Sequence, residues 1–487
     1  MSELTARRAR AVFIVTALGA FMASLDLSIV NVAFPALARS FPHVPRASLA
    51  WVITAYSIVF GSLLVTAGRT ADRLGRRRVF FLGLAVFCAG SALCGLAPSV
   101  PLLVAGRVAQ GSGAAALLPA SLGLLLGAFP AEKRSQVVAL WGGVGALAVA
   151  TGPSLGAALI TAGGWRSAFY VNLPVGALAW LWGRRILEES TVETAHGTPD
   201  FPGVALISLA LAGLVLAISE GPSWGWTSPR VLASLVLAVV LGAAFLLRSA
   251  GHPAPVLDLR LFRARSFSVA NASTLVYAMG FFAMLLGNIL FLTGVWHYTI
   301  LRAGLAVTPG PLVVAAVSGP AGRMARRFGF RAVLMPGAVC FAAALGWYAL
   351  RVGVHPAYLA EWLPGTLIAG LGIGLTFPVF SAAAVASLPP ERLAVGGAVN
   401  QTARQVGGAL GVALLVVLVG NPSSPASAVA HFHRLWIYCA AMALGSGLIG
   451  SRLGRPAPAQ AEVVEELAPE LPAVMASLPI ALEAGAE

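Results

Sequence analysis

The feature that most constrains this chain is a series of long apolar runs separated by short polar segments. A helix needs about 20 consecutive, mainly apolar residues to cross the hydrocarbon core of a bilayer. Fourteen runs meet this requirement, at residues 11–34, 48–67, 79–97, 101–127, 137–161, 167–183, 201–219, 230–247, 268–293, 304–320, 332–350, 358–387, 398–420 and 433–451. The sequence therefore predicts an all-α polytopic membrane protein with 14 transmembrane helices.

The composition supports this prediction and excludes other classes. The chain is 58% hydrophobic and only 10% charged, whereas soluble domains carry about 25% charged residues. The first apolar run, 11–34, is too long for a removable signal and is interpreted as a retained span. The net charge of +14 comes from small basic clusters between apolar runs, which argues against nucleic-acid binding. The four cysteines lie inside apolar runs without metal-ligand partners, so no metal site is expected.

The arginines and the single lysine predict the orientation, because basic residues near span ends favour the cytoplasmic side. With the N-terminus inside, 23 of the 32 Lys and Arg fall in inner loops and termini and seven in outer loops. The remaining two, Arg107 and Arg404, lie within spans. We therefore expect a multi-pass protein of the inner (plasma) membrane with both termini cytoplasmic.

An internal repeat predicts the domain organisation. Residues 68–75, GRTADRLG, align with residues 322–329, GRMARRFG, and both copies follow an even-numbered span. The repeat thus keeps its orientation, as parallel transporter repeats do. The expected units are an N-terminal six-helix bundle, a linker with two extra spans and an interfacial connector, a C-terminal six-helix bundle, and an acidic, disordered cytoplasmic tail, at residues 1–183, 184–266, 267–455 and 456–487.

Asp26 is the candidate proton carrier, because it alone among the 18 acidic residues lies well inside an apolar span. An intramembrane carboxyl group is expensive, and burial moves its proton affinity towards neutral pH. Arg107 in the fourth span needs a partner or water, because its guanidinium does not deprotonate. It could modulate the proton affinity of Asp26 or contact substrate. The alternatives are a structural Asp26–Arg107 contact, or an Arg107 strut to Gln110 and backbone carbonyls.

Two glycine-containing segments are candidates for conformational roles. The inner connection after the second span is expected to latch one arrangement of the bundles, or else to act only as a topogenic charge cluster; its candidate residues are Gly68, Asp72, Arg73, Gly75, Arg76 and Arg77. In the fifth span, Gly152, Pro153 and Gly156 remove side-chain bulk and one backbone donor. We expect them to form a contact surface between the bundles, with ordinary helix packing as the alternative.

Apolar and polar side chains in three spans are candidates for lining a substrate cavity, namely Asn31, Tyr277, Phe281, Asn288 and Phe377. Lipid-facing positions are the alternative for the aromatic residues. The chain contains no nucleotide-binding P-loop, which argues against ATP-driven transport. It also shows no constellation of nucleophile and base, so we do not expect an enzyme.

Several of these segments together resemble motifs of the major facilitator superfamily and, within it, of the fourteen-span drug:proton antiporters. The 68–77 segment resembles the loop motif after span 2, the 25–35 segment the span 1 motif, and the 106–113 segment the span 4 motif, whose arginine is associated with proton coupling. Gly152-Pro-Ser-Leu-Gly156 resembles the span 5 antiporter motif, although Ala148 and Ala157 replace glycines that are usual there.

The resemblance implies a major facilitator fold that works by alternating access of two bundles around a central cavity. We therefore expect a proton-coupled exporter of hydrophobic drugs or toxic small molecules that binds a small hydrophobic or cationic substrate. Because Asp26 is the one clear intramembrane acid, a monovalent cation or a neutral amphiphile is favoured over a dication. The energy source would be the proton gradient, without a cofactor, in a monomer embedded in lipid. The alternative is an exporter or flippase of a lipid or a dedicated natural product.

Overall fold

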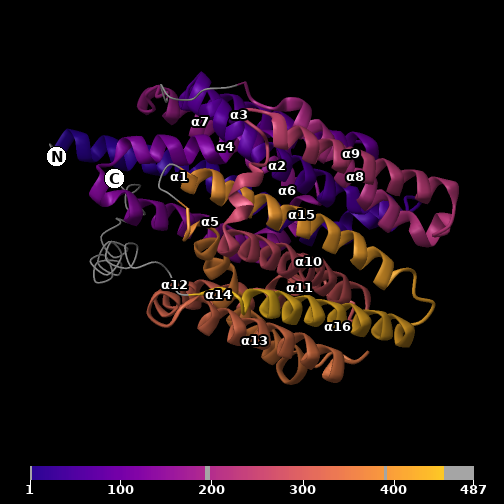
Figure 1. Cartoon of the computed structure of the whole chain (residues 1–487). Helices are drawn as coiled ribbons and strands as arrows, with labels where there is room; N and C mark the ends of the chain where they lie inside the picture. The colour runs from indigo at the N-terminus through magenta and orange to yellow at the C-terminus, as the bar shows by residue number, and fades with distance from the viewer. Residues whose placement is uncertain (1–2, 192–197, 389–391, 455–487) are drawn as a thin grey trace, which may run out of the picture.

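The computed structural model describes residues 3–191, 198–388 and 392–454, which form long helices joined by short connections (Figure 1). The helices are α1 (Glu3–Ser40), α2 (Arg46–Leu74), α3 (Arg76–Leu96), α4 (Val100–Ala128), α5 (Ala131–Gly163), α6 (Ser167–Tyr170), α7 (Asn172–Ile186), α8 (Phe201–Trp224), α9 (Pro229–Gly251), the 3-10 helix η1 (Leu259–Arg263), α10 (Arg265–Gly294), α11 (Ile300–Val307), α12 (Pro309–Phe328), α13 (Phe330–Arg351), the π-helix η2 (Tyr358–Trp362), α14 (Leu363–Val385), α15 (Leu393–Val419) and α16 (Pro425–Gly450). The predicted acidic tail lies outside the described residues.

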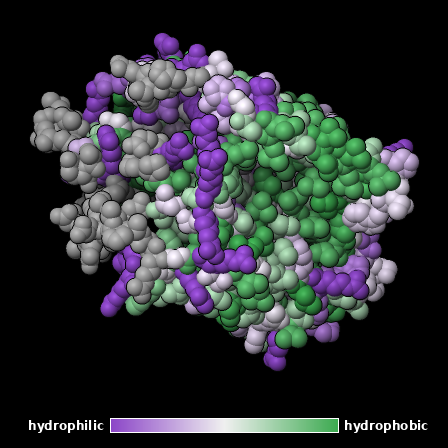
Figure 2. Space-filling model, viewed as in Figure 1, coloured by the Kyte–Doolittle hydropathy of each residue, from purple (hydrophilic) through white to green (hydrophobic). Residues whose placement is uncertain are grey.

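The all-helical prediction is confirmed, but the count of spans is lower than predicted. In the described part, 12 helical segments are long and apolar enough to cross a membrane, with α11 and α12 counted together as Ile300–Phe328. The other two predicted spans correspond to α7, which has only 15 residues, and to α16, which is 26 residues long but is not among these segments. Figure 2 shows a broad hydrophobic surface along the helices between more hydrophilic ends.

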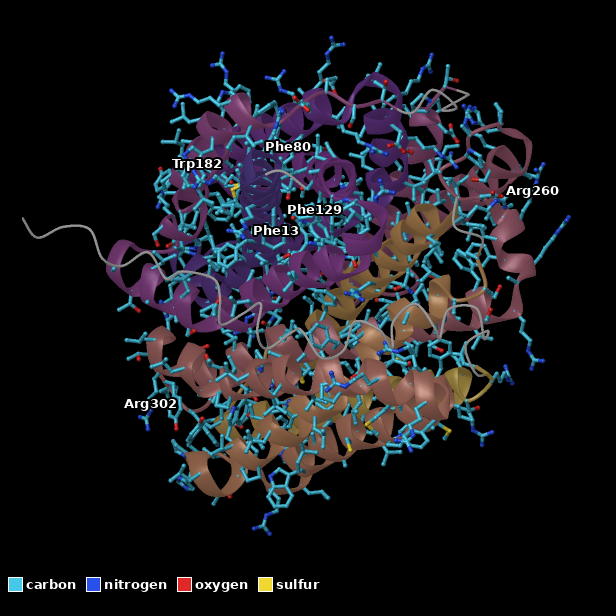
Figure 3. All side chains as sticks on the ribbon, turned by 90° about the vertical axis from the view of Figure 1, so that its left-hand side faces the viewer. Phe13, Phe80, Phe129, Trp182, Arg260 and Arg302 are labelled. Carbon is cyan, nitrogen blue, oxygen red and sulfur yellow. The ribbon has the colours of Figure 1, made fainter. Side chains whose placement is uncertain are left out.

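The helices before and after the α8–α9 pair form two halves of the molecule. In Figures 1 and 3, helices α1 to α7 lie together, and helices α10 to α16 lie together beside them. Helix α2 packs along α15 across the boundary between the halves, and α8 contacts both α2 and α15. The α8–α9 pair therefore lies at the seam between the two halves.

The two ends of the bundle differ in how tightly the halves meet. We call the end that carries Arg69, Arg76 and Arg323 the basic end, and the opposite end the far end. At the far end, one buried apolar cluster includes residues of both halves, from Phe34 of α1 to Leu415 of α15. At the same end, the Arg46 side chain donates a hydrogen bond to the Gly420 carbonyl across the halves (3.3 Å). The halves are therefore closed against each other at the far end.

Several glycines of both halves lie on helix faces that no other part of the protein covers. A Cβ atom added at Gly142 or Gly143 of α5 would meet no atom within 4 Å, and the same is true at Gly319 of α12 and Gly397 of α15. One buried cluster of the basic end consists of residues of the N-terminal half, such as Phe80 and Phe87, and a smaller one joins Val65 of α2 to Phe267 and Val399 of the C-terminal half. The buried apolar contact between the halves is therefore smaller at the basic end than at the far end.

The segment after the second predicted span is more helical than predicted. Helix α2 continues through Arg69 and Arg73 to Leu74, so only Gly75 forms the turn into α3. Gly75 has φ +111°, a backbone conformation that residues with a Cβ atom rarely adopt. The predicted tight connection is thus a single glycine between two helices.

Candidate functional site

A buried ion pair joins α1 to α4. Asp26 and Arg107 lie with Oδ2 and Nη1 2.5 Å apart, and their side chains are 0% and 1% exposed. These are the two residues that the sequence analysis singled out as intramembrane charges, and the structure brings them into direct contact. Asp26 is therefore satisfied inside the N-terminal half rather than presented to the space between the halves.

Polar side chains of three further helices complete the surroundings of Asp26. Gln110 of α4 and Asn172 of α7 donate hydrogen bonds to its Oδ1 (3.1 and 3.3 Å), and both also donate to Ser91 of α3 (2.6 and 3.2 Å). This geometry depends on the close approach of α3 to α4, since a Cβ atom at Gly90 would lie 2.7 Å from the Gln110 backbone nitrogen. The sequence alone does not indicate that Ser91 or Asn172 contacts Asp26, because each contact joins helices that are distant in the chain.

Arg107 is held as completely as Asp26. Its Nε donates to the Val52 carbonyl (2.8 Å), its Nη1 also donates to Gln110 Oε1 (2.8 Å), and its guanidinium lies 4.2 Å from the centre of the Tyr56 ring. The two structural alternatives considered for Arg107, a contact with Asp26 and a strut to Gln110 and a backbone carbonyl, therefore occur together.

The α2–α3 segment makes its contacts within the N-terminal half and with the connector. Asp72 accepts hydrogen bonds from Arg76 one turn later (2.9 Å), and Arg76 donates to the Gly123 carbonyl of α4 (3.2 Å). Arg69 donates to the Pro255 carbonyl of the connector (2.5 Å). A latch role for this segment stays a prediction.

Glu189 is a contact partner of this segment that the sequence analysis missed. Its carboxylate accepts hydrogen bonds from the backbone N–H groups of Arg77 and Arg78 at the start of α3 (3.0 and 3.2 Å). A Cβ atom at Gly75 would collide with the same carboxylate. Glu189 thus occupies the positive end of the α3 dipole and anchors the chain that follows α7.

The small residues of α5 serve two contacts. Gly152 and Gly156 face α1, where a Cβ at Gly152 would collide with Ser28 and one at Gly156 would lie 3.0 Å from Ile29. Pro153 instead faces α11 of the other half, where a Cβ at Gly304 would lie 2.5 Å from the Pro153 carbonyl oxygen. The segment therefore packs α5 both within its own half and across the boundary.

The five predicted cavity residues do not form one group. Phe281 and Phe377 are partly exposed and pack edge-to-face with centroids 4.8 Å apart, and Tyr277 packs against Phe377 at 5.1 Å. Asn288 accepts a hydrogen bond from Trp436 within the C-terminal half (3.1 Å), and Asn31 donates to the Leu27 carbonyl of its own helix (2.8 Å). The structure therefore brings together the three aromatic residues and leaves the two asparagines apart from them.

Arg404 joins this aromatic group from α15. Its guanidinium lies 4.5 Å from the centre of the Phe377 ring, and its Nη2 donates to Ser381 Oγ of α14 (2.9 Å). The sequence analysis placed Arg404 within a span but gave it no role. Its position could be found only from the packing of α15 against α14.

The comparisons with known proteins define the class of this chain. Residues 16–412 match the model of the Major Facilitator Superfamily, so the chain belongs to this family of membrane transporters. The fold is shared with a D-xylose–proton symporter (TM-score 0.65, 15% identity, 92% of this chain and 98% of the other) and with an auto-inhibited peptide transporter of the POT family (TM-score 0.67, 18% identity, 91% and 96%).

Relatives with higher sequence identity carry names of resistance and export proteins. The chain is 37% identical to the multidrug resistance protein Stp of Mycobacterium tuberculosis, over 82% of this chain and 74% of that protein. It is 33% identical to the tetracenomycin C resistance and export protein of Streptomyces glaucescens (83% and 75%) and 32% identical to the methylenomycin A resistance protein of Streptomyces coelicolor (84% and 85%).

Proposed function

We propose that this protein is a proton-coupled secondary exporter of small hydrophobic molecules, of the fourteen-span drug:proton antiporter type. Export is the activity named for one relative, and resistance to drugs or antibiotics is named for several. In this proposal α7, extended by α6, and α16 cross the membrane in addition to the 12 apolar segments. Two six-helix bundles would then flank the α8–α9 pair.

The observation that carries the proposal is the buried Asp26–Arg107 pair. Charged groups at membrane depth are expensive and are retained for function. A carboxylate that is released from its arginine by protonation gives two states with different packing of α1 against α4. Such a two-state element is what a proton needs in order to bias a conformational equilibrium.

The orientation and the cycle follow from the two ends of the bundle. The positive-inside rule assigns the basic end, where the buried contact between the halves is smaller, to the cytoplasm of the plasma membrane. Cargo enters from the cytoplasm, the halves rock about the α2–α15 seam, and a proton from outside binds Asp26 to favour cargo release and return. The energy source is the proton gradient, no cofactor takes part, and a monomer is sufficient.

Transport in inverted vesicles that contain the full chain tests this proposal. The readouts are accumulation of ethidium, a lipophilic cation, and of 8-anilinonaphthalene-1-sulfonate, a lipophilic anion, with the proton gradient present and after a protonophore. We expect gradient-dependent accumulation of at least one probe by the parent and its loss in Asp26→Asn. The matched control is Glu220→Gln, because Glu220 is buried in α8 and its carboxylate is bonded only to Ser223 among the described residues.

Equal gradient-dependent transport by the parent and Asp26→Asn would refute the proton-carrier role of Asp26. Accumulation of neither probe by the parent would shift support to the second candidate, an exporter or flippase of a lipid or a dedicated natural product. That candidate is favoured by the relatives named for a single antibiotic.

A further inference from the structure

Arg404 is a cation at membrane depth that no carboxylate of the described residues neutralises. It is the twelfth of the 27 residues of α15, so its side chain is about two turns or more from either end of the helix. Its Nε atom is buried and without a hydrogen-bond partner. Of the five N–H donors of a guanidinium, the structure shows one in use, between Nη2 and Ser381. This cation therefore retains unused binding capacity.

The direction in which Arg404 points follows from the helical periodicity of α15, 100° per residue. Val406 and Leu410 pack against α8, so their face of α15 is turned to the extra helix pair. Arg404 lies on the opposite side, in line with Gly397 two turns nearer the basic end. Gly397 is exposed, and a Cβ atom there would meet nothing within 4 Å. Arg404 therefore lies on the face of α15 that is turned away from the extra helix pair, in line with the uncovered surface at Gly397.

A chain of hydrogen-bonded polar side chains positions the Arg404 guanidinium. Ser381 accepts its hydrogen bond and in turn donates to Asn400 Oδ1 (3.4 Å), while Asn400 donates to Asn271 (3.2 Å) and to Thr274 (2.9 Å) of α10. Asn400, Asn271 and Thr274 are each at most 4% exposed. This chain of hydrogen bonds positions the guanidinium and contains no negative charge.

The Arg404 guanidinium is thus fixed by one hydrogen bond and has an N–H group without a partner. The rings of Phe377 and Phe281 form the apolar surface beside it. An unpaired arginine in a low-dielectric site gains most from an anion, since hydrogen bonds between a guanidinium and an oxyanion are charge-assisted and can be bidentate. The expectation of a cationic cargo rested on a free Asp26. The Asp26–Arg107 ion pair removes that basis, because the carboxylate is already neutralised and lies inside the other half.

We propose that Arg404 forms an anion subsite in the central space, and that the cargo is an aromatic or apolar molecule that carries a carboxylate or phenolate group. The guanidinium binds the oxyanion, and Phe377 and Phe281 contact the apolar body. The inference rests on the proposed function, which it extends from hydrophobic molecules to hydrophobic anions. An inside-negative membrane potential favours the exit of such a cargo.

Equilibrium binding to the full chain in zwitterionic nanodiscs tests the subsite without any proton gradient. The probes are 1-pyrenebutyrate and its uncharged analogue 1-pyrenebutanol, each corrected for partition into empty nanodiscs. We expect the parent to bind the carboxylate about 10- to 100-fold more tightly than the alcohol, the range for a hydrogen bond to a charged group. Arg404→Gln should abolish this preference, and Arg404→Lys should retain part of it.

Two further variants separate the subsite from general effects. Ser381→Ala removes the hydrogen bond that positions Arg404 and should weaken carboxylate binding several-fold with little effect on the alcohol. Arg302→Gln is the matched control, because Arg302 also lies over an aromatic ring, Tyr298 at 3.9 Å, but is exposed (Figure 3). It should leave both affinities unchanged. A monodisperse elution profile of each variant establishes that it is folded.

A parent that shows no preference for the carboxylate, or an Arg404→Gln variant that keeps it, would overturn the subsite. Either result leaves the proton-coupled cycle standing, because vesicle transport measures that cycle with other probes. Conversely, intact carboxylate binding together with transport that ignores the proton gradient would refute the proposed function and retain the subsite. Competition by added phosphatidylglycerol in the parent alone would assign the same subsite to an anionic lipid.

Discussion

Arg107 and Arg404 both lie within long apolar helices, and both place the guanidinium over an aromatic ring, at 4.2 Å from Tyr56 and 4.5 Å from Phe377. They differ in the hydrogen-bond and ionic partners of the guanidinium group. Arg107 has a carboxylate, a side-chain amide and a backbone carbonyl, whereas Arg404 has one serine hydroxyl. The comparison shows that the first arginine is fully paired inside the N-terminal half and that the second keeps a buried N–H group without a partner.

The largest expected effect comes from breaking the closed pair. Asp26→Leu leaves the Arg107 cation buried without its partner, which should lower the free energy of unfolding by about 3–5 kcal/mol. The double variant Asp26→Leu/Arg107→Met removes both charges and should recover most of that loss. Thermal unfolding of the purified variants in detergent measures both. An Asp26→Leu variant as stable as the parent would mean that burial of the Arg107 cation does not depend on the Asp26 carboxylate.

The next largest effect is expected from disturbing the packing of α5 against α1, the helix that carries Asp26. Gly152→Val forces a side chain into Ser28 of α1, two residues from Asp26, and overpacking of this kind costs about 1–3 kcal/mol. Gly143→Val is the control in the same helix, because the space around Gly143 is open. Thermal unfolding of the two variants side by side provides the comparison. Equal destabilisation would attribute the effect to valine in the helix rather than to the α1–α5 contact.

A third arginine, Arg248, tests pairing at the edge of the membrane. Its Nε lies 2.6 Å from Asp200, which caps α8. Burial raises the pKa of Asp200, but the hydrogen bonds from Arg248 and from the Gly203 N–H lower it further, so the net pKa lies below the ordinary value. The stabilisation is therefore present above about pH 3.9, the ordinary value, and is lost as the pH falls through the lower folded value.

We expect Asp200→Asn to be less stable than the parent at pH 7 by about 1 kcal/mol or less, since Arg248 is partly exposed. The difference should shrink as the pH falls below about 4, because the parent then loses its charge as well. Unfolding temperatures of both proteins from pH 7 down to pH 3 provide the measurement. A difference that grows on acidification would contradict the assigned sign.

The smallest expected effect is that of removing Arg404. Arg404→Met replaces an unpaired cation with an apolar side chain of similar length, a change that is often neutral or stabilising in a buried site. The unfolding temperature should therefore equal or exceed that of the parent, in contrast to Asp26→Leu. A loss as large as the one expected for the Asp26 variant would show that Arg404 is a structural strut, which would erase the difference between the two arginines.

The sequence predicted the helical membrane architecture because long apolar runs have one physical solution in a bilayer. It also identified Asp26 and Arg107, because a charge inside an apolar run is visible without a structure. It could not reveal Ser91, Asn172 or Ser381, since these are ordinary polar residues whose significance depends on which helices touch. The boundaries of α2 were missed for a related reason: charged residues such as Arg69 end an apolar run but continue a helix.

The position of α8 and α9 has a consequence for the environment of the protein. Only 17% of the apolar window of α9 is buried, and its main contact is with α8, so most of its surface is available to hydrocarbon. Helix α8, to which α9 is joined, touches both α2 and α15. A change in bilayer thickness that tilts this pair would therefore act on the contact between α2 and α15, where the two halves meet. Lipid composition would then act on the turnover of the protein as a mechanical load.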